Sequence, residues 1–265
     1  MKRKSLIDLK QMKESGTKIV SLTAYDYLGA QAIEQAGLDF ILVGDSLGMV
    51  VLGYESTLPV TIDEMIHHAK AVVRGAPYTM VVVDMPFMSY QQSPREALRH
   101  AGRIIKETGA HAVKLEGGLE MVDTVKQLVS MGIPVMGHLG LLPQSVNQQG
   151  GYKVQGKKDE DEERLQKDIR VLEEAGCFAV VLECIPRLLA KNLTARVSIP
   201  TIGIGAGVDC DGQILVWHDL LGLTEGPSPK FLKRYVNLSL GIREALRAYQ
   251  KEVVSVEFPS LEYSY

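Results

Sequence analysis

Residues 39–48, DFILVGDSLG, contain the pattern that recurs along this chain and from which its fold can be predicted. The apolar run at 40–43 is too short for a helix and ends on glycine, which predicts a strand buried on both faces, as in a parallel sheet. Asp45 and Ser46 follow directly after this glycine. A carboxylate where a buried strand opens into a loop is costly unless it has a charged or metal partner, so we expect Asp45 to have one.

Ionisable residues also follow four later apolar runs. These runs lie near 80–83, 112–113, 135–136 and 178–182, and they lead into Asp84, into Lys114 and Glu116, into His138 and into Glu183. One ionisable strand end is expected by chance. Five of them, counting Asp45, indicate that the strand ends meet in one shared site.

Eight strand candidates alternate with helical patterns along the chain. They lie near residues 20, 41, 81, 113, 135, 180, 202 and 215. Eight strands joined by helices in roughly 250 residues are typical of a (β/α)8 TIM barrel. An open doubly wound sheet is the alternative, but it would concentrate its site at one switch point, whereas the polar strand ends here are spread over many strands. We therefore predict an α/β barrel.

We expect a single barrel domain over residues 1–265, because the sequence contains no linker or low-complexity tract. An amphipathic pattern at 6–12 predicts a short N-terminal helix that closes one end of the barrel. The tail at 257–265 is too broken for a helix, so we expect it to be irregular and to pack on a neighbouring surface. The polar, glycine-rich segment 144–158 predicts a mobile active-site loop, with an ordinary surface loop as the alternative.

Several helix starts carry recognisable caps. Thr61 and Glu64 form a capping box, and the acidic run at 159–163 favours the positive N-terminus of another helix. Asp26 follows the first strand and could serve a site, but we favour a structural role, either in a turn or at a helix cap.

The composition excludes several classes of partner. The net charge of −3 provides no basic surface for nucleic acid or an anionic membrane. The basic N-terminus lacks a signal-peptide core, and no apolar run approaches transmembrane length. The odd number of cysteines, Cys177, Cys184 and Cys210, favours a reducing compartment. We expect a cytoplasmic protein that binds small molecules, with no nucleic-acid or membrane partner.

Asp45, Asp84 and Glu116 offer only hard oxygen ligands. Three carboxylates at a barrel mouth would repel one another without a cation, and carboxylates without thiolate or imidazole partners suit Mg²⁺. Because Mg²⁺ usually takes one or two carboxylates directly, one of the three could act through water. The alternative is that each carboxylate caps a following helix.

Lys114 lies two residues before Glu116, so both side chains point to the same face of one strand. A lysine that faces a barrel centre could neutralise a substrate carboxylate or a developing oxyanion. A Schiff-base role and an ion pair with a neighbouring carboxylate are alternatives.

Glu183 ends the most apolar strand, and an apolar setting makes a carboxylate a better general base at neutral pH. His138 could donate a hydrogen bond to a substrate or be a structural histidine. A metal, an anion-binding lysine and a base together suit removal of a proton next to the carbonyl of a 2-oxo acid, with the metal stabilising the enolate. The residues alone do not identify the electrophile.

Six segments closely resemble the ketopantoate hydroxymethyltransferase family. They are GDSLGMVVLGY (44–54), TLPVTIDEM (57–65), VVVDMPFMSY (81–90), GAHAVKLEGG (109–118), GHLGLLPQS (137–145) and ILVWHDLLGL (214–223). The resemblance spans most of the chain. It implies a (β/α)8 barrel of the phosphoenolpyruvate/pyruvate-binding superfamily and a cytoplasmic homo-oligomer, typically a decamer.

The resemblance also implies a reaction and a set of roles. The reaction transfers a hydroxymethyl group from 5,10-methylenetetrahydrofolate to 3-methyl-2-oxobutanoate, giving 2-dehydropantoate and tetrahydrofolate in pantothenate biosynthesis. By resemblance, the Mg²⁺ site consists of Asp45, Asp84 and Glu116; the 2-oxo acid contacts are Asp45, Ser46, Asp84 and Lys114; and the proton acceptor is Glu183. His138 is a possible accessory residue.

Two other classes of function stay open at this point. One is a lyase or mutase of the same superfamily, but the isocitrate-lyase type carries a reactive cysteine in a basic loop of the KKCGH kind, and no cysteine here lies in such a loop. The other is a non-catalytic barrel that serves as a binding or assembly module. Such a function would not explain why five strands end in polar residues.

Overall fold

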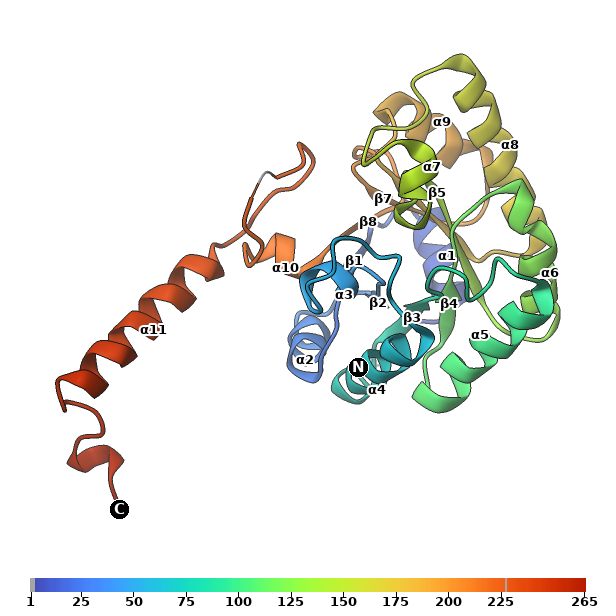
Figure 1. Cartoon of the computed structure of the whole chain (residues 1–265). Helices are drawn as coiled ribbons and strands as arrows, with labels where there is room; N and C mark the ends of the chain where they lie inside the picture. The colour runs from blue at the N-terminus through green and yellow to red at the C-terminus, as the bar shows by residue number, and fades with distance from the viewer. Residues whose placement is uncertain (1–2, 227) are drawn as a thin grey trace. The chain divides into compact units, whose positions relative to one another are not determined.

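The computed structural model describes residues 3–226 and 228–265 (Figure 1). The chain divides into two compact units, Met1–Val216 and Trp217–Tyr265. None of the described helices combines the length and the apolar character needed to span a bilayer.

The first unit is a closed barrel of eight parallel strands in chain order, each hydrogen-bonded to the next, with β8 pairing back to β1 (Figure 1). The strands are β1 (Ile19–Thr23), β2 (Phe40–Val43), β3 (Met80–Asp84), β4 (Ala112–Lys114), β5 (Val135–Gly140), β6 (Ala179–Glu183), β7 (Thr201–Ile204) and β8 (Gly212–Leu215). The predicted (β/α)8 barrel is confirmed, and each strand lies where the sequence indicates one.

Helices follow most strands and pack side by side around the barrel. They are α2 (Tyr27–Gln35), α4 (Ile62–Gly75), α5 (Pro94–Thr108), α6 (Val122–Ser130), α8 (Asp159–Ala175) and α9 (Arg187–Arg196). Shorter elements at the carboxyl ends of the strands are α3 (Leu47–Val50), η1 (Leu119–Met121), η2 (Pro143–Ser145) and α7 (Val146–Gln149).

The helix starts confirm the capping signals in the sequence. Thr61 and Glu64 form the expected capping box at α4. The side chain of Asp26 accepts a 2.7 Å hydrogen bond from the amide of Gly29 and thereby caps α2. Asp26 is therefore a structural residue, as favoured, and α8 begins at Asp159 within its acidic run.

The N-terminal helix α1 (Leu6–Glu14) contributes to the barrel core, as its apolar pattern predicts. Leu9 is fully buried in the cluster that fills the barrel interior, and Leu6 and Met12 pack against that cluster. Ile7 is instead exposed, so it does not belong to the apolar face of the helix. Apolar side chains of α1 therefore extend the apolar core of the barrel at this end.

The second unit contains α10 (Trp217–Leu220), α11 (Leu238–Val254) and η3 (Leu261–Tyr263). The long helix α11 was not anticipated from the sequence. It exposes an apolar stripe made of Ile242, Leu246, Tyr249 and Val253, whose spacing puts them on one face of the helix.

Candidate active site

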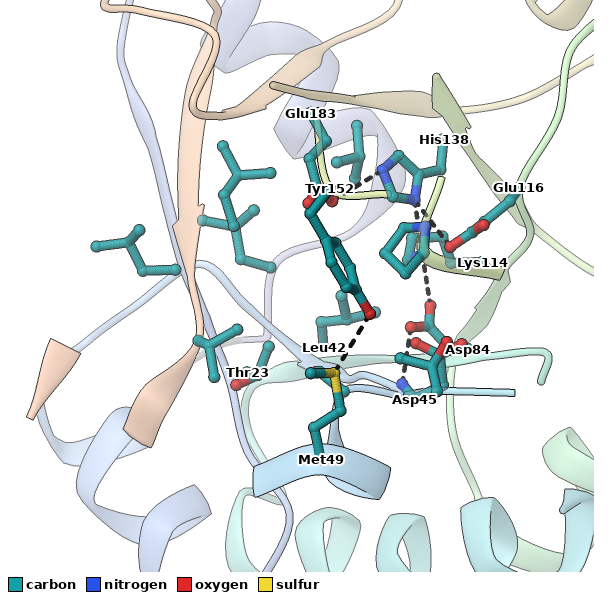
Figure 2. A pocket seen from close by; sticks show the side chains of 18 residues that line it. Thr23, Leu42, Asp45, Met49, Asp84, Lys114, Glu116, His138, Tyr152 and Glu183 are labelled. Atoms are coloured by element: carbon teal, nitrogen blue, oxygen red, sulfur yellow. Dashed lines mark hydrogen bonds and ion pairs between the residues drawn. The ribbon is translucent and has the colours of Figure 1, made fainter. Parts of the chain in front are cut away.

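A cavity of about 170 Å³ lies within the ring of strand ends in the first unit (Figure 2). Its lining includes every residue that the sequence analysis proposed for the site, namely Asp45, Ser46, Asp84, Lys114, Glu116, His138 and Glu183. Strand ends that are far apart in sequence therefore do converge, as predicted. The roles of the individual residues stay predictions.

Asp45 and Asp84 come from neighbouring strands and touch directly. The amide of Asp45 donates a 3.0 Å hydrogen bond to Oδ2 of Asp84. Both carboxyl groups are buried. Burial, together with the negative charges of Asp84 and Glu116, raises the pKa of Asp45 well above its ordinary value. This crowding of acids favours a cation in their midst, because a positive charge relieves the repulsion.

Lys114 supplies one such charge. Asp84 and Lys114 are register partners at the ends of β3 and β4, and Nζ of Lys114 lies 2.9 Å from Oδ1 of Asp84. Burial lowers the pKa of Lys114, but the carboxylates of Asp84, Glu116 and Asp45 outweigh it and leave the pKa raised. The lysine is therefore a fixed cation and a poor candidate for an amine nucleophile in this state.

His138 lies between the lysine and two acids (Figure 2). Its Nδ1 is 3.2 Å from Nζ of Lys114 and 3.5 Å from Oε1 of Glu116. Its Nε2 is 3.1 Å from Oε2 of Glu183. A continuous chain of contacts therefore runs from Asp84 through Lys114 and His138 to Glu183. Burial and the positive charge of Lys114 lower the pKa of His138. The carboxylates of Glu116 and Glu183 outweigh these two effects, so the pKa is raised above its ordinary value.

Glu183 ends β6, and its side chain is 16% exposed, compared with 3% for Glu116. Its backbone is held by Gly140, whose positive φ of 98° and missing Cβ allow the Glu183 carbonyl to approach closely. The Glu183 carboxylate reaches the cavity from β6, which is separated from β3 and Asp84 by β4 and β5.

Ser46 lies in the turn that begins at Gly44, in which the amide of Leu47 donates a hydrogen bond to the Gly44 carbonyl. A Cβ on Gly44 would lie 2.8 Å from Oγ of Ser46 and 3.5 Å from Oδ2 of Asp84. Oγ of Ser46 is also 2.8 Å from the hydroxyl of Tyr25. The glycine therefore leaves room for the serine hydroxyl next to the acidic pair.

Much of the remaining wall of the cavity is apolar, although Thr23 and Thr57 also line it. The apolar part is formed by Leu42, Met49, Val181, Ile204, Ile214 and Leu215. The cavity can therefore hold a small molecule that is anionic at one end and hydrocarbon at the other.

Sequence reasoning missed Gln144 and Tyr90. Gln144 was placed at the start of a loop, but it is buried in η2 and its Nε2 donates a 2.8 Å hydrogen bond to Oδ2 of Asp45. Tyr90 is buried, and its hydroxyl accepts a 3.1 Å hydrogen bond from the amide of Glu116. Both belong to segments that resemble the family, which was the one available signal. Tyr152, later in the same loop, lines the cavity.

The side chains at the strand ends fit a magnesium ion by their chemistry. Asp45, Asp84 and Glu116 are crowded, buried acids that offer oxygen donors only, which is the donor set that Mg²⁺ prefers. Among the described residues, no set of three acidic, histidine or cysteine side chains is already arranged as a complete metal cage. Lys114 and Gln144 instead contact these acids, and Mg²⁺ usually needs only one or two carboxylates plus water.

Known proteins of high similarity cover the whole chain. The family model for ketopantoate hydroxymethyltransferase matches residues 3–261. The 3-methyl-2-oxobutanoate hydroxymethyltransferase of Carboxydothermus hydrogenoformans is 58% identical over 265 residues, which cover 100% of this chain and 96% of that protein. The protein of the same name from Syntrophus aciditrophicus is 57% identical and covers 97% of this chain and 94% of its own length.

Solved structures with the same barrel are more distant in sequence. A crystal structure of 2,3-dimethylmalate lyase has a TM-score of 0.63 at 19% identity, covering 93% of this chain and 87% of that one. A phosphonopyruvate hydrolase in complex with oxalate and Mg²⁺ has a TM-score of 0.59 at 12% identity, covering 97% and 92%. These likenesses concern the fold alone. The sequence matches identify the chain as an enzyme that belongs to the ketopantoate hydroxymethyltransferase family.

Proposed function

We propose that this enzyme transfers a hydroxymethyl group from 5,10-methylenetetrahydrofolate to 3-methyl-2-oxobutanoate, giving 2-dehydropantoate and tetrahydrofolate. The observation that carries this proposal is the single small cavity in which Asp45, Asp84, Lys114 and Glu183 meet. The names of the relatives support the choice of substrate. The reaction belongs to pantothenate biosynthesis.

The cavity suits a branched 2-oxo acid at both of its ends. Lys114 provides a buried positive charge for the carboxylate or the 2-oxo oxygen, and Ser46 provides a hydroxyl next to it. Leu42, Val181 and Ile214 form an apolar wall that would accommodate the two methyl groups on C3. The polar and apolar sides of the cavity would orient the 2-oxo acid. Its carboxylate is unfavourable against the apolar wall, and its methyl groups are unfavourable beside the charged side chains.

Asp45 and Asp84, with Glu116 directly or through water, would hold the Mg²⁺. When bound, the ion supplies positive charge that favours an anionic form of the 2-oxo acid. The solved relative that contains oxalate and Mg²⁺ shares only the barrel, so it supports the proposal at the level of the fold.

Glu183 would accept the proton from C3. His138, 3.1 Å from its carboxylate, would orient it and stabilise the negative charge before the proton arrives. C3 then forms a carbon–carbon bond to the one-carbon unit, whose bonds to the folate nitrogens break. Water supplies the hydroxyl oxygen, and tetrahydrofolate leaves. We place the folate on the side of the segment 144–158, where Tyr152 lines the cavity.

A lyase that depends on a cysteine is disfavoured by the thiols. Cys177 and Cys210 are buried, and Cys184, next to Glu183, is partly buried. Burial and the charge of Glu183 raise the pKa of Cys184 to about 12, so its reactive thiolate form is rare at neutral pH.

We further propose a cytoplasmic homo-oligomer, with the decamer that the family resemblance implies. The apolar stripe of α11, made of Ile242, Leu246, Tyr249 and Val253, supports association because an exposed stripe of this kind typically packs against a partner.

The experiment that tests the catalytic proposal is proton exchange at C3 of 3-methyl-2-oxobutanoate in D₂O. NMR follows the exchange without folate, in the presence and absence of Mg²⁺, and so isolates the deprotonation from the transfer. We expect exchange that depends on Mg²⁺, followed by formation of 2-dehydropantoate once the folate is added. A protein that shows no exchange under either condition would contradict the proposal.

A further inference from the structure

Gln144 contacts both sides of the acidic cluster at once. Its side-chain Nε2 donates a hydrogen bond of 2.8 Å to Oδ2 of Asp45 and one of 2.9 Å to the carbonyl oxygen of Met85. Its backbone amide donates a bond of 3.1 Å to Oε2 of Glu116. One residue therefore connects the carboxylates that end or follow β2 and β4, two strands that are not neighbours in the barrel.

The other end of the same amide is also held. Oε1 of Gln144 accepts hydrogen bonds from the hydroxyl of Tyr90, at 2.7 Å, and from Nε2 of Gln91, at 3.1 Å. The hydroxyl of Tyr90 in turn accepts a bond from the amide of Glu116, at 3.1 Å. Tyr90 thus contacts both the side chain of Gln144 and the backbone of Glu116.

The polarity of these contacts defines one orientation of the amide. Asp45 and the Met85 carbonyl are both acceptors, so they require the NH₂ group of Gln144. The Tyr90 and Gln91 groups are donors, so they require its oxygen. Gln144 is buried, and a buried amide with all its groups paired is rigid.

We propose that Gln144 is a positioning residue that holds Asp45 and Glu116 in the orientation needed to bind the metal, and that Tyr90 locks Gln144 in turn. The inference rests on the proposed magnesium site. It adds two residues that contact the proposed metal ligands without being ligands themselves. Such outer-shell partners typically change metal affinity or activity by about 10- to 100-fold when they are removed.

The chain offers a matched control in Gln149, on the same segment. Its Nε2 donates to the carbonyl of Gly140, and its Oε1 accepts from the amide of Leu142. Gln149 therefore also joins two parts of the loop through its amide, but these bonds go to backbone groups. Replacing either glutamine by methionine preserves length and removes the amide.

The experiment compares Gln144→Met, Gln149→Met and Tyr90→Phe by calorimetric titration with MgCl₂, in the absence of the 2-oxo acid, and by thermal unfolding. We expect Gln144→Met to weaken Mg²⁺ binding by about 10- to 100-fold, and Gln149→Met to bind as the wild type does. Tyr90→Phe should weaken binding in the same direction but less, because the amide remains. At saturating Mg²⁺, C3 exchange in Gln144→Met should recover most of its wild-type rate.

Each outcome decides between a positioning and a merely structural role. A lower unfolding temperature of Gln144→Met with unchanged Mg²⁺ affinity would overturn the inference and leave the magnesium site intact. Wild-type protein that fails to bind Mg²⁺ would overturn the proposed metal and this inference with it. If Gln144→Met does not fold, the Tyr90→Phe variant provides the test. Unchanged Mg²⁺ affinity in Tyr90→Phe would contradict the proposal that Tyr90 holds Gln144 in the orientation needed for metal binding.

Discussion

The imidazole Nε2 of His138 lies 3.1 Å from Oε2 of Glu183, while the opposite ring nitrogen faces Lys114 at 3.2 Å. The histidine therefore joins the cationic part of the cavity to its most accessible carboxylate. Because Lys114 can only donate, Nδ1 accepts, and the proton of a neutral ring is then on Nε2, on the side of Glu183. This proximity of His138 to Glu183 motivates the first two predictions.

Glu183→Gln should reduce C3 proton exchange by about 10²-fold or more, the scale expected for a lost general base. Glutamine preserves the size of the side chain and most of its hydrogen bonds but removes the basic oxygen. NMR in D₂O with Mg²⁺ measures the exchange, and calorimetry should show Mg²⁺ and 2-oxo acid binding close to the wild type. Exchange at the wild-type rate would exclude Glu183 and make His138 the leading candidate for the base.

His138→Gln should lower the same exchange rate by about tenfold, the equivalent of one charge-assisted hydrogen bond to a carboxylate. The loss should be smaller than that of Glu183→Gln, because the base itself remains. Steady-state exchange at several 2-oxo acid concentrations separates the maximal rate from substrate binding. A loss equal to that of Glu183→Gln would show that the histidine takes part directly in proton transfer.

Asp84→Asn and Asp45→Asn should each weaken Mg²⁺ binding by more than the roughly 10- to 100-fold typical of outer-shell residues. The substitution removes a charged oxygen donor with little change of volume. Asp26→Asn is a matched control, because Asp26 caps α2 and asparagine is an equally good cap. Calorimetry reports the affinities, and unchanged values in both site variants would refute the metal assignment.

The wild-type protein should scatter light with a mass several times that of the 29.1 kDa chain. Leu246→Asp should shift the protein toward smaller species, because it puts a charge in the middle of the apolar stripe of α11. Arg247→Asp changes the charge at the adjacent, also exposed, position and should leave the mass unchanged. A monomeric wild type at micromolar concentration would exclude the proposed assembly.

Stability should fall below about pH 6.5 through His111, whose pKa is lowered by burial and by the nearby charge of Arg3. Its Nδ1 accepts a 3.0 Å hydrogen bond from the amide of Val81 and must be unprotonated to do so. A lowered folded-state pKa means that folding favours the neutral ring. The contribution is therefore complete above the unfolded-state pKa and is lost as the pH falls below it.

The control for this effect is His111→Asn, which retains a side-chain acceptor but does not titrate. The difference in free energy of unfolding between wild type and variant, from urea denaturation at pH 8 and pH 5, should narrow or reverse at the lower pH. The expected change in this difference between the two pH values is about 1 kcal/mol, the contribution of one hydrogen bond. A difference that does not depend on pH would assign the acid sensitivity to other groups.

The amino-acid sequence was enough to predict the barrel and the ionisable side chains that line its cavity. Short apolar runs predict buried parallel strands wherever they occur, because the pattern is local, and parallel strands in a barrel bring their carboxyl ends to one face. Asp45, Asp84, Lys114, Glu116, His138 and Glu183 could thus be named together before their contacts were known, and they do line one cavity.

The contacts among these groups, and the residues that hold them in place, became known only from the three-dimensional structure. The bond from Gln144 to Asp45 spans 99 positions, and the bond from Tyr90 to Gln144 spans 54. Such contacts depend on strand register and on the path of the loop after β5, which local periodicity does not encode. Glutamine and tyrosine are also common in loops, so their composition predicts surface rather than a buried network. Their role arises from burial, which makes every unpaired amide and hydroxyl costly and so selects one arrangement.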